Sequence, residues 1–163
     1  MKIAAALFIT VFLFSVVVYA GTPVTEIVLY DDAGGERYVF RPKDGRFMVR
    51  FLHSWARSPV DELFVLSDDV LVLTGTAYED FGAGLPHEPE AGGQPMRIEG
   101  GKIRLDGIDR PVPNLQIRVG RFVANHELFY DDVQLPLSRL FTPGETAVFG
   151  VRKTRRYALW FGI

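Results

Sequence analysis

Short runs rich in β-branched and aromatic residues, separated by clusters of Gly, Pro and Asp, fill the sequence after residue 24. This pattern is typical of β-strands joined by turns. The candidate strands span residues 25–30, 37–41, 46–54, 61–66, 69–79, 95–99, 101–105, 114–119, 121–130, 145–151 and 156–162. No connection between them is long enough to hold a crossover helix, so neighbouring strands should pair antiparallel. We therefore expect an all-β fold, an antiparallel β-sandwich or barrel-like domain.

The first twenty residues form an apolar segment that differs from everything after it. Lys2 is the only charged residue before Glu26. A short positive start followed by an apolar run predicts a secretory signal peptide, and Val18 and Ala20 suit a cleavage site before Gly21. The run, residues 3–20, is also close to the roughly 20 residues that cross a bilayer as a helix. We expect one N-terminal hydrophobic helix, residues 1–20, that is either a signal peptide or a membrane anchor.

The remaining residues, 21–163, suit a single extracytoplasmic domain. The sequence contains no cysteine, which excludes a disulfide framework, thiolate metal ligands and a Cys nucleophile. Export without cysteine is common in bacteria, so we expect a periplasmic location or the outer face of the inner membrane. Without Lys2 the domain keeps 17 of the 18 basic residues against 20 acidic ones. This balance gives no general basic surface for a nucleic acid.

Two segments depart from the regular alternation of strands and turns. Residues 80–95 are rich in Gly and Pro, and a loop of this length is often functional or disordered. Residues 152–156 hold four basic side chains. Their simplest interpretation is a solvated turn between two strands, and the alternative is a patch that faces anionic lipid headgroups or an acidic partner. Residues 132–141 suit a short helical turn, because Pro136 opposes a long helix.

A first candidate site lies where the strand 46–54 ends. Phe47, Val49 and Phe51 alternate onto one face, and His53 continues that face. One interpretation is a core histidine. The other is a functional His53 at the mouth of the sandwich, paired across a turn with Glu62, since a carboxylate would fix the imidazole tautomer and favour its protonated form.

A second candidate site is the glycine pair in residues 81–86, Phe-Gly-Ala-Gly-Leu-Pro. Gly82 and Gly84 allow positive φ and expose backbone amides, and such a nest of amides can hold a carboxylate or another anion. The alternative is a tight structural turn. The motif is not a dinucleotide-binding fingerprint, because it lacks a third glycine and no helix follows it.

The same residues give little support for catalysis or for a metal. His53 and Ser54 are adjacent on a strand, so their side chains point to opposite faces, and no nucleophile elbow is present. His53, His87 and His126 lack the spacing of metal ligands. We expect no catalytic residues, no metal site and no cofactor.

Taken together, the two motifs resemble the DUF1850 family of small exported proteins of bacteria and archaea. The string Phe81-Gly82-Ala83-Gly84-Leu85-Pro86 is the more specific part. The likeness also includes the strand at 71–78, the segment 115–120 and the N-terminal apolar run, and residues 55–58 depart from the usual pattern by lacking an acidic residue at position 56. The motif residues carried over are His53, Ser54, Arg57, Pro59, Glu62, Phe81, Gly82, Gly84, Leu85 and Pro86.

This resemblance implies a transport context rather than a mechanism. Members look like companions of TAXI-type TRAP transporters, which pair a solute-binding protein with a large permease. The implied function is a non-enzymatic transport accessory protein that docks on the permease or on the solute-binding protein. The alternative is a domain that binds a small organic anion between His53, Arg57 and the amides of residues 82–84, because an arginine can hold a carboxylate with two hydrogen bonds.

Overall fold

The computed structural model describes residues 2–54, 57–79, 96–121 and 125–161. Strands dominate this part of the chain. They are β1 (Pro23–Tyr30), β2 (Glu36–Phe40), β3 (Arg46–Leu52), β4 (Pro59–Ser67), β5 (Val70–Tyr78), β6 (Arg97–Glu99), β7 (Lys102–Pro111), β8 (Leu115–Arg118), β9 (Glu127–Tyr130), β10 (Val133–Pro136) and β11 (Thr146–Arg155). The helical elements are α1 (Lys2–Gly21), a 3-10 turn η1 (Leu137–Arg139) and α2 (Arg156–Phe161).

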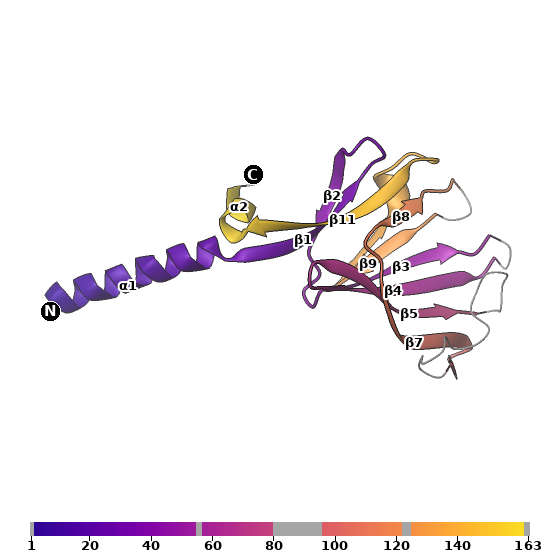
Figure 1. The fold of residues 1–163 in the computed structure, drawn as a ribbon, viewed down its shortest axis with the longest axis horizontal. Coiled ribbons are helices and arrows are strands. Elements are labelled where there is room, and N and C mark those ends of the chain that lie inside the picture. Colours follow the sequence, from indigo (N-terminus) through magenta and orange to yellow (C-terminus); the bar gives the residue numbers. More distant parts are fainter. Residues whose placement is uncertain (1, 55–56, 80–95, 122–124, 162–163) are drawn as a thin grey trace. The chain divides into compact units, whose positions relative to one another are not determined.

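The strands form two sheets. The smaller has the order β2-β1-β11-β8 and the larger the order β10-β9-β3-β4-β5-β7-β6 (Figure 1). The β1–β2, β8–β11 and β9–β10 pairs and the central pairs of the larger sheet are antiparallel. This confirms the predicted all-β, antiparallel, sandwich-like fold with one N-terminal helix.

Contacts within the chain define two units. One consists of Ile27–Val151 and contains the core of the sandwich, and the other combines Met1–Glu26 with Arg152–Ile163. The helix α1 of the second unit occupies the predicted apolar segment. Among the helices that the structure describes, none combines the length and the apolarity needed to cross a membrane.

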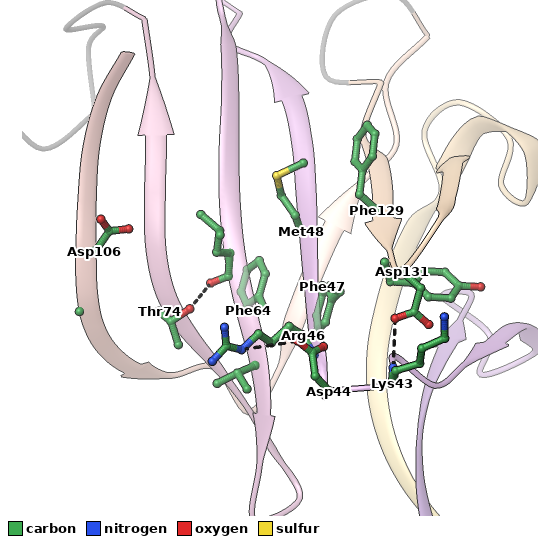
Figure 2. Close-up of a pocket in the computed structure, with 14 residues that line it drawn as sticks. Lys43, Asp44, Arg46, Phe47, Met48, Phe64, Thr74, Asp106, Phe129 and Asp131 are labelled. Atoms are coloured by element: carbon green, nitrogen blue, oxygen red, sulfur yellow. Dashed lines mark hydrogen bonds and ion pairs between the residues drawn. The ribbon is translucent and has the colours of Figure 1, made fainter. Parts of the chain in front are cut away.

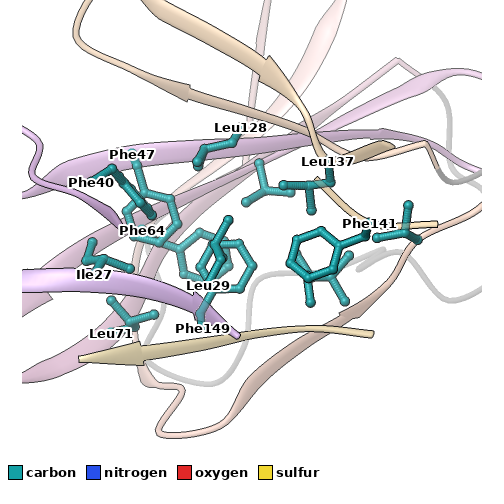
Figure 3. Close-up of a cluster of buried hydrophobic side chains, with 14 of the residues drawn as sticks. Ile27, Leu29, Phe40, Phe47, Phe64, Leu71, Leu128, Leu137, Phe141 and Phe149 are labelled. Carbon is teal, nitrogen blue, oxygen red and sulfur yellow. The ribbon is translucent and has the colours of Figure 1, made fainter. Parts of the chain in front are cut away.

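Aromatic and aliphatic side chains from both sheets fill the space between them. Phe47 of β3 stacks on Phe64 of β4, with ring centroids 5.2 Å apart, and on Phe149 of β11 at 5.9 Å. Ile27 and Leu29 of β1 belong to the same buried cluster (Figure 3). The two sheets therefore share one core, and the predicted alternation of Phe47 and Val49 onto the buried face of β3 is confirmed.

Several predicted elements differ from the structure. The predicted strand 156–162 is wrong, because α2 occupies Arg156–Phe161. The predicted turn at 152–156 is also wrong, because β11 continues to Arg155. A short apolar run does not distinguish a strand from a single helical turn. Residues 132–141 contain the predicted helical turn as η1, but β10 precedes it and was not predicted.

Replacement of Phe47 tests the shared core. Phe47→Ala removes a ring that packs against both sheets, so we expect the free energy of unfolding to fall by about 3–5 kcal/mol in urea denaturation. Ile98→Ala is the control, because Ile98 is 79% exposed and should change stability by less than about 0.5 kcal/mol. Equal losses in the two variants would contradict this account of the core.

Candidate functional site

The predicted residues His53, Ser54, Arg57 and Pro59 lie in the hairpin that joins β3 to β4. The His53 amide donates a hydrogen bond to the Ser58 carbonyl at 2.9 Å, and the Arg57 amide donates one to the His53 carbonyl at 2.9 Å. Arg57 has a φ of 51° and is exposed, while Pro59 is the first residue of β4. The turn thus brings His53 and Arg57 together through their backbones.

Glu62 lies farther along the hairpin than the sequence suggested. In the β3–β4 register Leu52 pairs with Pro59 and Val49 pairs with Glu62. Glu62 is therefore roughly 13 Å along the strands from the level of His53, at about 3.3 Å per residue. The predicted His53–Glu62 pair is wrong, because the strand register places Glu62 opposite Val49, while Ser58 lies opposite His53.

The Glu62 carboxylate faces the interior of the sandwich. It shares its face of β4 with Val60 and Phe64, both buried, and pairs across the sheet with the buried Thr76. Burial raises the pKa of Glu62 above its ordinary value of 4.5, and the charge of Arg110 on β7 opposes this only in part. Glu62 is therefore a half-buried acid that the fold biases toward its protonated form.

The second predicted motif, Phe81, Gly82, Gly84, Leu85 and Pro86, lies outside the described residues, as does His87. The anion pocket predicted around His53, Arg57 and the 82–84 amides is thus described only at its hairpin side. No group of three His, Asp or Glu side chains that could hold a metal ion occurs among the residues that the structure describes.

A site that the sequence did not reveal lies on the outer face of the larger sheet. Asp61 of β4, 6% exposed, accepts hydrogen bonds from both Nε and Nη2 of Arg50 on β3, the second at 2.9 Å. Lys102 Nζ of β7 donates to the same carboxylate at 3.3 Å. Burial raises the pKa of Asp61, but the bonds and charges of Arg50 and Lys102 outweigh it, so the pKa lies below its ordinary 3.8.

An open hollow, which we call the sheet-face groove, lies over the same sheet. It has a volume of about 930 Å³ and is lined by four apolar side chains that share the strand face of Arg50 and Asp61: Met48, Leu63, Val65 and Phe129. Figure 2 labels Met48 and Phe129. The Arg50 guanidinium lies 5.1 Å from the centre of the Phe129 ring. A second hollow of about 250 Å³, beside Asp61 and Lys102, shares Met48 and Leu63 with the groove. One apolar strip therefore connects the two hollows.

An irregularity in β5 lies at the groove, because the extra residue Thr74 is one of the residues that line it. Leu63 pairs with Gly75 and Phe64 with Leu73, so Thr74 is an extra residue in β5. Its hydroxyl donates to the Leu63 carbonyl at 3.2 Å. A Cβ added to Gly75 would come within 3.0 Å of the Leu105 carbonyl oxygen. Because such a bulge bends its strand and increases the local twist, the sheet curves at the floor of the groove.

Charged side chains of both signs surround the apolar strip. Lys43 and Arg46 lie at one end together with Asp44 and Asp131, and the Arg46–Asp44 distance of 3.9 Å marks an ion pair. Arg50 and Lys102 are balanced by Asp61, and Arg104 approaches Glu99 at 3.7 Å. An apolar centre with a charged rim of mixed sign suits a protein surface better than a free anion.

The signal for this face was present in the sequence. Every residue is apolar in two runs, Phe47-Met48-Val49 and Leu63-Phe64-Val65, so apolar side chains point to both faces of these strands. A strand with only one buried face alternates apolar and polar residues, so an uninterrupted apolar run indicates that its second face is also covered or occupied.

Asp61→Asn tests the cluster. The carboxylate has a lowered pKa in the fold, so its stabilisation is present above the unfolded pKa of about 3.8 and is lost as the pH falls through the folded value. We expect the variant to lose about 2 kcal/mol at neutral pH, a deficit that shrinks in acid. Asp44→Asn is the control, because that side chain is 65% exposed; a similar deficit there would refute a special role for Asp61.

Glu62→Gln should give the opposite pH dependence. The folded state binds the Glu62 proton more tightly than the unfolded chain does, so this contribution is complete below about pH 4.5 and is lost as the pH rises through the folded pKa. We expect the variant to be more stable than the wild type at neutral pH and close to it near pH 4. Urea denaturation across this range measures the difference, and a difference independent of pH would contradict the assignment.

The comparisons with known proteins place this site within a family. No curated protein and no solved structure matches the chain significantly. The family model described as "Domain of unknown function (DUF1850)" matches residues 47–137, more than half of the chain. Apart from Arg46, the match contains every strand of the larger sheet and the β3–β4 hairpin. It also contains the residues that line the sheet-face groove, except Lys43, Asp44 and Arg46. This chain therefore belongs to the DUF1850 family.

Proposed function

We propose that this chain is a non-enzymatic, extracytoplasmic accessory protein of a TAXI-type TRAP transporter and that it docks through the sheet-face groove. The observation that carries the docking role is the apolar strip of Met48, Leu63, Val65 and Phe129 on the outer face of the larger sheet. An outer sheet face is normally polar, and a contiguous apolar patch with a polar rim marks an interaction site.

The charge arrangement supports a protein as the occupant. Asp61 is paired with two cations, so a partner that covers it does not bury an isolated charge. The Arg50 guanidinium lies 5.1 Å from the centre of the Phe129 ring, and arginine and aromatic residues are enriched at protein interfaces. The groove spans β9, β3, β4, β5 and β7, which gives a partner one continuous surface.

The identity of the partner rests on the family and on α1. Membership of DUF1850 together with the resemblance to transporter companions leads us to propose the permease or its TAXI solute-binding protein as the docking partner. The apolar segment of α1 supports a location outside the cytoplasm, at the membrane where a permease resides.

Photo-crosslinking from the groove tests the proposal. A crosslinking amino acid at Met48 should capture a transporter subunit in native membranes, and mass spectrometry identifies the captured protein. The double variant Met48→Glu/Phe129→Glu should abolish co-purification of that subunit and solute uptake, because each change buries a charge at the centre of the contact.

The matched control is Ile98→Glu. Ile98 is exposed on β6 and does not line the groove, so this variant should retain both co-purification and uptake. Urea denaturation of both proteins confirms that they are folded. Capture of proteins other than transporter subunits, or unaffected uptake in the folded double variant, would overturn the proposal.

The second candidate function is recognition of a small organic anion at the β3–β4 turn. The observation that favours it is the turn itself, which places His53 and Arg57 within one hydrogen-bonded loop. A ligand at 100 times its dissociation constant should stabilise the fold by about 2.7 kcal/mol. A thermal-shift screen of organic acids measures this, with Arg57→Gln expected to remove the shift; a flat response to every acid would exclude this function.

A further inference from the structure

The helix α1 exposes apolar side chains around its circumference. Leu7, Phe8 and Ile9 are consecutive in α1 and are all more than half exposed. Near the other end of the helix, Val17 and Val18 are also more than half exposed, and Val16 is 39% exposed. Consecutive residues of a helix point in different directions, so this helix has no polar face. A single protein surface covers one side of a helix, whereas an apolar medium covers all sides.

The short helix α2 is fastened to the end of α1. The Arg156 guanidinium lies 4.5 Å from the centre of the Tyr19 ring and donates to the Tyr19 hydroxyl at 3.1 Å. Its Nε donates to Thr22 Oγ1 at 3.1 Å, and its backbone amide donates to the Thr22 carbonyl at 3.0 Å. The Trp160 ring lies 6.4 Å from the Tyr19 ring. We call Tyr19, Thr22, Arg156 and Trp160 the clasp.

The surroundings of the clasp are aromatic and basic. Tyr157 and Trp160 are 42% and 56% exposed, and Lys153 and Arg155 are exposed at the end of β11. The sequence has no acidic residue in 2–25 or in 153–163. The first acidic residue of the sequence, Glu26, forms an ion pair with Arg152 at 3.1 Å. A local positive charge therefore coincides with exposed aromatic rings where the apolar helix ends.

We propose that the clasp and the basic residues beside it form a contact surface for the headgroup region of an anionic phospholipid bilayer. Tyr and Trp prefer the level at which hydrocarbon meets headgroups, which assigns this position to Tyr19, Tyr157 and Trp160. Lys153 and Arg155 face the lipid phosphates. The apolar side chains of α1 enter the hydrocarbon beneath them, and the positive 152–156 segment becomes a lipid contact rather than a solvated turn.

This surface exists only in a chain that keeps α1. Tyr19 precedes the sequence-predicted cleavage site between Ala20 and Gly21, and Thr22 follows it, so the clasp spans that site. The helix α1 also continues through Gly21, which leaves no extended segment there for a peptidase. The bilayer contact therefore requires that the working protein retains residues 1–20.

Tryptophan fluorescence on lipid vesicles tests this contact. The chain has two tryptophans, so the full-length Trp55→Phe protein reports on Trp160 alone. Transfer from detergent to vesicles of phosphatidylcholine and phosphatidylglycerol should shift the Trp160 emission to shorter wavelength and protect it from acrylamide. The double variant Lys153→Gln/Arg155→Gln should bind these vesicles about fivefold more weakly per charge removed and should bind pure phosphatidylcholine vesicles as before.

The matched control is Arg118→Gln/Arg121→Gln, which removes two exposed arginines from the other unit and should leave both affinities unchanged. Three outcomes would overturn the proposal. They are a floated protein whose Trp160 remains open to acrylamide, equal affinity of wild type and the Lys153/Arg155 variant for anionic vesicles, and an intact mass of the membrane-extracted protein that lacks residues 1–20. Each outcome is independent of whether a transporter subunit binds the groove.

Discussion

In the β3–β4 hairpin, Phe47 pairs with Phe64 and Arg50 with Asp61, and the remaining features of the sandwich follow from this register. The first pair turns inward and stacks in the core between the sheets. The second turns outward and forms a partly buried ion pair on the opposite face. A slip of one residue would exchange the two faces, burying Arg50 and exposing Phe47. A one-residue slip would break both the ion pair and the ring stack, so both interactions stabilise the native β3–β4 register.

Much of the fold was readable because strands have a period of two and turns have a distinctive composition. The runs at 25–30, 37–41, 46–54 and 61–66 correspond to β1–β4, and the turns between them carry Gly, Pro or Asp. The misreading of residues 156–162 has a local cause. Six residues make less than two turns of helix, too few for a helical period to emerge, and the burial of Ala158 within its unit, which the sequence does not display, favours the helix.

The candidate site was less predictable, because pairing register decides which side chains meet. Glu62 is only nine residues after His53, yet the β3–β4 register pairs Glu62 with Val49 and so places it at a different level of the hairpin from His53. Asp61, by contrast, meets Lys102 from 41 positions away. Proximity in the sequence led us to pair His53 with Glu62. The partner of Asp61, Lys102, reaches it through the strand order β3-β4-β5-β7, which the sequence does not display.

The backbone bulge at Thr74 and most of the side chains that line the groove belong to different residues. The pairing is irregular here because β5 has one additional residue, which is held by a hydrogen bond to the Leu63 backbone beside the closely packed Gly75. Of the side chains that line the hollow, Thr74 takes part in holding the bulge, whereas Met48, Val65 and Phe129 do not. A relative that keeps the bulge can therefore exchange Met48, Val65 or Phe129 for other residues and change its partner while retaining the same concave seat. Such a protein would diversify by exchanging the side chains that line the groove, while the backbone bulge stays the same.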